Sequence, residues 1–232
     1  MTSKEGVRTG TGFTSSFIKY MSYTDGRDKV NRTVQYGARF ILWYFDRYGG
    51  VLSTIQKVQN LESALTSSRK LFRMARTLDF LQKALDALGK KDETEKALEV
   101  LGYLFKAIWL FSDHLIWFGK IKLIQIDTKQ WGQRSAWCWL AANSTLAARD
   151  LYKLQQLIIQ AEELKQSGNS SHRGNLPGDM QKVKLQLAVD LCDILIPLAS
   201  LGYINKGLGA AGGVTSSLIG GYLVWEKNIG SK

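Results

Sequence analysis

The sequence predicts an all-α protein: a helical bundle of long amphipathic helices with a glycine-rich C-terminal membrane helix. Only two prolines occur in 232 residues, so long helices can run without interruption. Apolar residues recur at three- and four-residue steps, and no stretch of any length alternates as a β-strand does. The segment 207–225 contains no charged residue, and about twenty such residues span a bilayer core.

The predicted elements follow one another in a simple order. The chain divides into a loose N-terminal arm (1–26), an amphipathic helical region (27–166), a glycine- and serine-rich linker (167–179) and a C-terminal helical region (180–232). Periodicity predicts helices at about 28–48, 51–88, 93–118, 128–166 and 180–201, followed by the membrane segment 207–225.

The composition indicates what kind of partner the protein binds and whether its cysteines form disulfides. The formal charge of +11 favours anionic partners such as phospholipid headgroups, nucleic acid or acidic proteins. Cys138 and Cys192 lie far apart in apolar contexts, so reduced thiols are expected instead of a disulfide framework. Residues 1–12 are polar and lack the apolar core of a secretory signal peptide.

The stretch 61–88 is the first candidate for a membrane contact. Its apolar stripe comprises Leu71, Met74, Leu78, Leu81, Leu85 and Leu88, widened by Ala64, Leu65, Phe72 and Ala75. Beside or opposite the stripe lie four cations with no acid between them: Arg69, Lys70, Arg73 and Arg76. Such a helix can insert among acyl chains with its cations at anionic headgroups. It can equally be an ordinary bundle helix with a solvated basic face.

The uncharged segment 207–225 carries a second pattern. Small residues recur every four positions, at Gly209, Gly213, Ser217 and Gly221. This spacing lets two helices approach closely in lipid and predicts a self-association surface. The alternatives are a glycine-rich loop and a helix inside a soluble bundle. A match to the dinucleotide-binding fingerprint within this segment is rejected because no strand precedes it.

The segment 98–118 is strongly apolar but contains Lys106, Asp113 and His114. It fits an interfacial helix, a bundle helix, or a span whose polar face meets other helices. The two histidines and two cysteines of the chain do not form the sets that a metal site or an activated nucleophile needs. No catalytic residue, metal site or cofactor is therefore predicted.

Five sets of residues, spread over almost the whole chain, share the pattern of a known family. They are Arg27-Asp28-Lys29 with Gln35-Tyr36; Leu61-Glu62-Ser63 with Ser68 to Arg73; Asp113, Trp117, Gly119 and Lys120; Trp131, Arg134 and Ser135 with Arg149-Asp150; and Asp190, Asp193 and Ile196-Pro197-Leu198 with Leu201-Gly202 and the glycine-rich tail. In this order they resemble the peroxin-11 family of peroxisomal membrane proteins. The short linker resembles fungal members more than animal ones.

The resemblance implies a function that composition does not give. Family members elongate the peroxisomal membrane before division, self-associate, and help to bring in a dynamin-related fission GTPase and its tail-anchored adaptor. Their membrane-remodelling amphipathic helix corresponds to the block that starts at Leu61. By this correspondence the inserted side chains are Leu65, Leu71, Phe72, Ala75 and Leu78, with Leu81 continuing the stripe, and the lipid-facing cations are Arg69, Lys70, Arg73 and Arg76.

The resulting prediction is a non-enzymatic homo-oligomer of the peroxisomal membrane that elongates and curves the membrane by amphipathic-helix insertion and promotes peroxisome fission and proliferation. Two alternatives stay open: a peroxisomal solute channel lined by 98–118 and 207–225, and a helical adaptor that recruits fission factors. No nucleic-acid-binding motif is recognisable, so nucleic acid is not expected as a partner.

Overall fold

The computed structural model describes residues 12–166 and 175–230. Within these ranges the chain forms eight helices and no strand, which confirms the all-α prediction. The helices are α1 (Phe13–Ser22), α2 (Thr24–Tyr48), α3 (Leu52–Phe72), α4 (Arg76–Ala87), α5 (Glu93–Lys120), α6 (Thr128–Gln166), α7 (Leu176–Ser200) and α8 (Lys206–Asn228).

Three predicted segments differ most clearly from the structure: the arm, the linker and the helix at 51–88. The arm predicted at 1–26 contains α1, whose Phe13 and Tyr20 rings pack on Trp225, a contact that local sequence does not show; residues 1–11 lie outside the described residues. The linker predicted at 167–179 overlaps the start of α7, and its residues 167–174 lie outside the described ranges. The single helix predicted at 51–88 is interrupted at residues 73–75.

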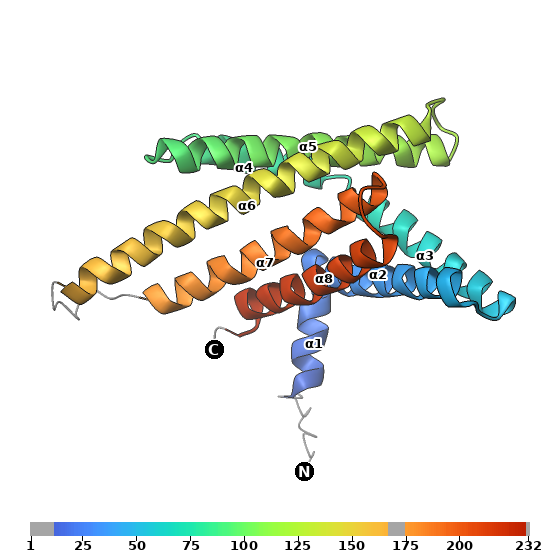
Figure 1. Ribbon diagram of the computed structural model, residues 1–232, viewed down its shortest axis with the longest axis horizontal. Coiled ribbons are helices and arrows are strands. Elements are labelled where there is room, and N and C mark those ends of the chain that lie inside the picture. The colour runs from blue at the N-terminus through green and yellow to red at the C-terminus, as the bar shows by residue number, and fades with distance from the viewer. Residues whose placement is uncertain (1–11, 167–174, 231–232) are drawn as a thin grey trace, which may run out of the picture.

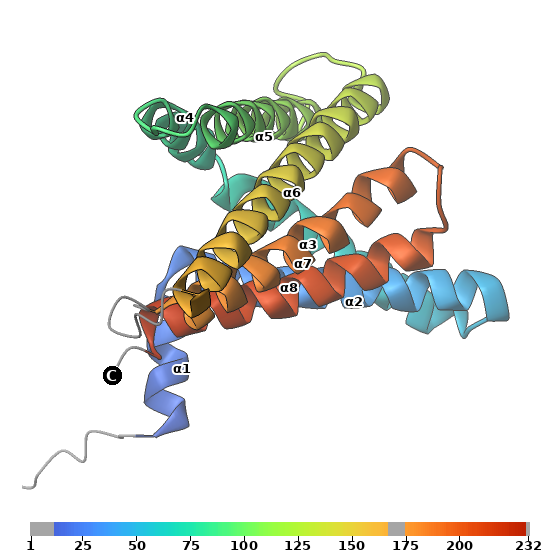
Figure 2. The same cartoon turned by 60° about the vertical axis from the view of Figure 1, so that its left-hand side comes forward.

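The helices pack as a chain of neighbours (Figures 1 and 2). α4 lies beside α5, and α6 crosses from α5 to α7. α7 pairs with α8, α8 with α2, and α2 with α3. α3 also touches α5, so the N-terminal hairpin meets the α4–α6 layer near the junction of α3 and α4. α1 projects from the bundle, away from the α4–α6 layer.

The interior of the bundle is rich in charged groups. Arg32 of α2 donates to Asp193 of α7 at 2.5 Å, with both side chains buried. On α6, Arg149 pairs with Asp150 at 2.5 Å and with Glu99 of α5 at 3.4 Å. Large apolar side chains are meanwhile exposed on all eight helices. A soluble protein favours the opposite distribution, whereas membrane proteins turn charged groups inward.

Lys29 adds a charge to this interior at a measurable cost. Its ammonium group lies over Gly220 of α8, and burial together with the nearby charge of Arg32 lowers the pKa of Lys29 from 10.5 to about 8. The folded state therefore binds this proton less tightly than the unfolded state does. Below pH 8 the penalty is fully present, and it disappears as the pH rises towards 10.5.

We expect Lys29→Met to raise the free energy of unfolding in detergent at pH 7 by up to about 3 kcal/mol. The advantage over the parent chain should shrink between pH 8 and pH 10, because in this interval Lys29 is largely neutral in the folded parent but still charged in the unfolded parent. Chemical denaturation of both proteins at several pH values measures this difference. A difference that stays constant with pH would contradict the assignment.

α8 is long and apolar enough to cross a membrane, the one such helix among the described residues. It coincides with the predicted membrane segment 207–225. The side chain of Asn205 caps its start by accepting from the backbone N–H of Gly207 at 2.7 Å. Its two faces differ: Leu208, Leu218 and Tyr222 are exposed, while the glycine face packs on α2 and α7.

Candidate membrane-contacting surface

α4 turns its leucines away from the rest of the chain. Leu78 is 68% exposed and Leu85 61% exposed, whereas Ala84 and Ala87 are buried against α5. A bundle helix in water would bury its leucines and expose its small residues. The stripe of 61–88 is therefore not the core of this chain along α4.

α5 carries a similar exposed stripe. The exposed leucines on this side are Leu78, Leu81 and Leu85 of α4 with Leu88, its C-cap residue, and the large exposed apolar residues of α5 are Leu101, Leu104, Ile108 and Phe111. The helices touch where Phe80 packs on Tyr103, with ring centroids 6.1 Å apart.

On each helix the exposed residues lie about a third of a turn around the helix axis from the residues that touch the other helix. Seen along each chain direction, this rotation has the same sense on α4 and on α5. Because α4 and α5 are antiparallel neighbours, equal rotations bring both sets to one side. We call these eight residues the α4–α5 apolar face.

The end of α3 extends the exposed apolar surface towards this hairpin. Of the apolar residues predicted to contact the membrane, Leu65 is half-buried and the rest are exposed: Leu61 at the start of the block, and Leu71, Phe72, Ala75, Leu78 and Leu81. Phe72 is 65% exposed. The predicted stripe is therefore accessible, but the break at 73–75 divides it between two helices.

His114 of α5 contacts the backbone at this break. Its Nε2 lies 3.2 Å from the carbonyl oxygen of Arg73, within hydrogen-bond distance. The N–H of Arg76 donates to the same carbonyl at 3.0 Å, which closes a tighter turn than an α-helix has. A side chain that takes a backbone carbonyl out of the helical ladder kinks the helix. Burial lowers the pKa of His114, which favours its neutral form.

The four predicted cations do not face outward. Arg69 is only 5% exposed. The ion pairs are Arg69–Asp28 (2.9 Å), Lys70–Asp113, Arg73–Asp113 (2.8 Å), Arg76–Asp25 and a longer Arg76–Asp28 contact (3.7 Å). Burial alone would raise the pKa of Asp28, but the charges of Arg69, Arg73 and Arg32 hold it below its ordinary value. The acids come from α2 and α5, so the sequence around the cations gives no sign of them.

The small-residue ladder of α8 is occupied within the chain. Gly209, Gly213 and Ser217 are buried, and Gly221 is half-buried. A Cβ on Gly213 would lie 2.3 Å from the ring of Tyr36, and one on Gly209 would lie 2.4 Å from Ala199. The ladder thus brings α8 close to α2 and α7. Its predicted role in self-association stays a prediction.

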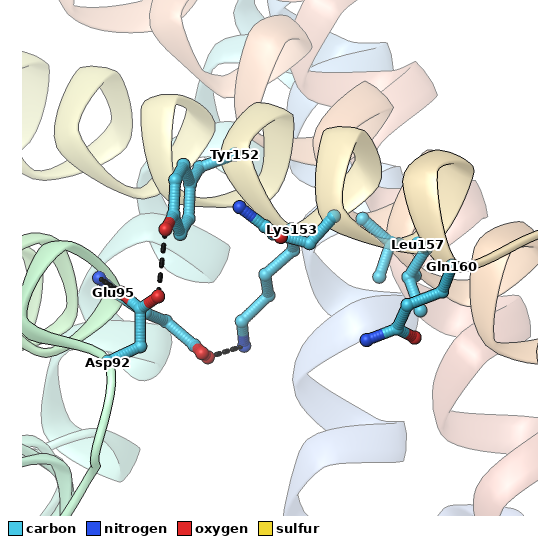
Figure 3. Close-up of a pocket in the computed structure, with 8 residues that line it drawn as sticks. Asp92, Glu95, Tyr152, Lys153, Leu157 and Gln160 are labelled. Carbon is cyan, nitrogen blue, oxygen red and sulfur yellow. Dashed lines mark hydrogen bonds and ion pairs between the residues drawn. The ribbon is translucent and has the colours of Figure 1, made fainter. Parts of the chain in front are cut away.

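A shallow polar pocket lies where α6 passes the start of α5 (Figure 3). Tyr152 donates its hydroxyl hydrogen to Asp92 at 2.8 Å, and Lys153 pairs with Glu95 at 2.8 Å. These contacts hold α6 against the first turn of α5, so four polar groups of the pocket are already bound in pairs. Among the described residues, no group of three or more His, Cys, Asp or Glu side chains can hold a metal ion.

Known proteins resemble this chain over most of its length. The model of the family described as peroxisomal biogenesis factor 11 matches residues 14–225. A peroxisomal membrane protein of Saccharomyces cerevisiae, PMP27, is 28% identical, and peroxisomal biogenesis factor 11 of Schizosaccharomyces pombe is 27% identical; in each case 90% of this chain and 93% of the relative are covered. Human peroxisomal membrane protein 11B is 25% identical over 88% of this chain and 94% of its own length.

No solved structure matches the chain. The family is described as one of peroxisomal biogenesis factors, and the human relative as a peroxisomal membrane protein. This protein belongs to the peroxisomal biogenesis factor 11 (PEX11) family and is located in the peroxisomal membrane.

Proposed function

We propose that this protein elongates and curves the peroxisomal membrane and thereby promotes peroxisome fission and proliferation. The α4–α5 apolar face carries the proposal, because its eight large apolar residues are each between 38% and 68% exposed on the described chain. Burying such a side chain gains about 1.5–3 kcal/mol. A face inserted into one leaflet enlarges that leaflet relative to the other, and the bilayer bends.

The proposed action is mechanical and needs no catalysis. The remaining parts of the proposal are self-association, contact with anionic phospholipid, and cooperation with a dynamin-related fission GTPase and its tail-anchored adaptor. The exposed apolar stripe supports the lipid contact, because its side chains gain from leaving water.

Two leucines of α4 test the proposal. The full chain is reconstituted into vesicles that contain phosphatidylserine, and vesicle elongation is scored by electron microscopy. We expect Leu78→Gln/Leu85→Gln to reduce elongation at least tenfold, because two inserted side chains lose about 3 kcal/mol or more of burial. The fold should be retained, since both side chains are already exposed.

The matched control is Leu151→Gln/Leu191→Gln, which alters two similarly exposed leucines on α6 and α7, at 54% and 50% exposure. It should elongate vesicles as the parent chain does. If the α4 variant elongates vesicles like this control, the α4–α5 apolar face does not act as proposed. The channel and adaptor alternatives both predict no effect of either variant on vesicle shape.

A further inference from the structure

The basic segment 69–76 is held in place by acids from two other helices. Asp25 and Asp28 lie in the first turns of α2, and Asp113 lies in the second half of α5. Asp113 accepts from both Lys70 and Arg73, whose side chains are each 12% exposed. In this arrangement the cations bind carboxylates and are turned away from any headgroup.

The apolar neighbours of these cations are arranged in the opposite way. Leu71 and Phe72 are 45% and 65% exposed, although they lie between Lys70 and Arg73 in sequence. A helix that binds an anionic membrane fully presents its apolar and its basic residues together. In this structure only the apolar side chains of the segment are exposed, and its basic side chains are bound to carboxylates of the same chain.

The backbone at the break allows the segment to change. Residues 73–75 contain neither glycine nor proline, and apolar periodicity continues through them. The local sequence therefore favours one continuous helix, and tertiary contacts interrupt it: His114 on the carbonyl of Arg73 and Asp113 on its guanidinium. In a continuous helix Arg69, Arg73 and Arg76 would share one side, three to four residues apart.

We propose that Asp25, Asp28 and Asp113 form an acidic clasp that keeps the membrane-binding segment 69–76 closed. Opening the clasp frees four cations for anionic phospholipid headgroups and lets α3 and α4 join into one amphipathic helix. The clasp regulates the membrane contact described under the proposed function and rests on it. Carboxylates and headgroup phosphates compete for the same cations, so an anionic leaflet is the partner that opens the clasp.

The test uses the full chain in proteoliposomes and two measurements. Trypsin cleavage after residues 69, 70, 73 and 76, in neutral phosphatidylcholine vesicles, reports opening without any membrane remodelling. We expect Asp113→Asn to speed this cleavage at least tenfold, because two cations lose their buried partner. Cleavage after Lys182 and Lys184 of α7 should stay unchanged, which distinguishes clasp opening from unfolding of the bundle.

Asp25→Asn serves as a milder second variant. The side chain of Asp25 is 53% exposed, so its replacement should leave the fold intact and speed cleavage after Arg76 alone. The matched control is Asp86→Asn on α4, which removes one exposed negative charge that holds no cation of the segment. It should be cleaved at the parent rate.

In vesicles rich in phosphatidylserine, Asp113→Asn should elongate membranes at lower protein density than the parent chain or Asp86→Asn. Cleavage of Asp113→Asn at the parent rate in neutral vesicles would overturn the clasp. Failure of the proposed function looks different: the parent chain and all variants leave vesicle shape unchanged, whatever their cleavage rates.

Discussion

Gly213→Ala is expected to weaken the docking of α8 on α2 and to lower the free energy of unfolding by about 2–3 kcal/mol. A Cβ at this position would lie 2.3 Å from the ring of Tyr36. That ring is 4% exposed and is flanked by the guanidinium groups of Arg32 and Arg39, at 5.4 and 5.0 Å from its centroid. The ring therefore has little room to move aside. Thermal unfolding in detergent should show a midpoint lower by roughly 5–10 °C.

Gly37→Ala on α2 provides the matched control. Nothing lies within 4 Å of a Cβ placed there, so the substitution gains only helix propensity. It should stabilise the chain by about 0.5–1 kcal/mol. The same chemical change is thus expected to have opposite signs at two helical glycines. Equal shifts for both variants would show that close helix contact is not what the glycine of α8 provides.

This prediction also bears on self-association. Small residues every four positions are read from sequence as a surface for a second copy of the helix. The structure places Gly213 against α2 and Gly212 against α7 of the same chain. A glycine variant that loses self-association must therefore first be checked for an intact α2–α8 contact.

The sequence predicts elements well where periodicity is long and uninterrupted. α6 begins and ends as predicted at 128–166, and α5 differs from its prediction by two residues at one end. The segment 207–225 was identified from its lack of charge, a property of composition alone. In each case the signal lies within the element itself.

The break between α3 and α4 and the partners of the cations lay beyond sequence reasoning. Nothing in residues 73–75 stops a helix, since the interruption depends on Asp113 and His114 some forty residues away. The basic cluster likewise has no acid within its own segment, because its acids lie on other helices. A useful signal was present in α5, where adjacent charged and polar residues in an apolar helix required partners. Sequence alone could not identify those partners.

Charge reversal should have different consequences in an isolated peptide and in the full chain. In a peptide covering 57–88, replacing all four cations by glutamate is expected to abolish tubulation of anionic liposomes. Each cation near such a surface contributes about 1 kcal/mol, and the reversal turns attraction into repulsion. In the peptide no carboxylate of α2 or α5 is present. The measurement therefore reports lipid attraction alone.

In the full chain a single reversal already acts on the fold. Arg69 donates to Asp28 through Nε at 2.9 Å and through a second guanidinium nitrogen at 3.3 Å, with both side chains largely buried. Arg69→Asp therefore places two carboxylates together and should cost about 3–5 kcal/mol of stability. Exchanging the pair, as Arg69→Asp with Asp28→Arg, should restore a large part of this loss. Thermal unfolding of the two single variants and the exchanged pair gives the coupling energy directly.

The control for the exchange is the pair Lys96 and Glu93 at the start of α5, three residues apart, in which Glu93 is exposed and Lys96 is half-buried. Its exchange should change stability by about 0.5 kcal/mol or less.

The exchanged Arg69–Asp28 protein then separates two roles of Arg69, in the fold and at the membrane. The fold of this protein is restored, but the arginine now lies on α2, and the segment 69–76 has one cation fewer. If the segment acts on lipid through its cations, this protein should be stable and yet elongate anionic vesicles less than the parent chain. Full elongation would mean that the charge of Arg69 serves the fold and not the membrane.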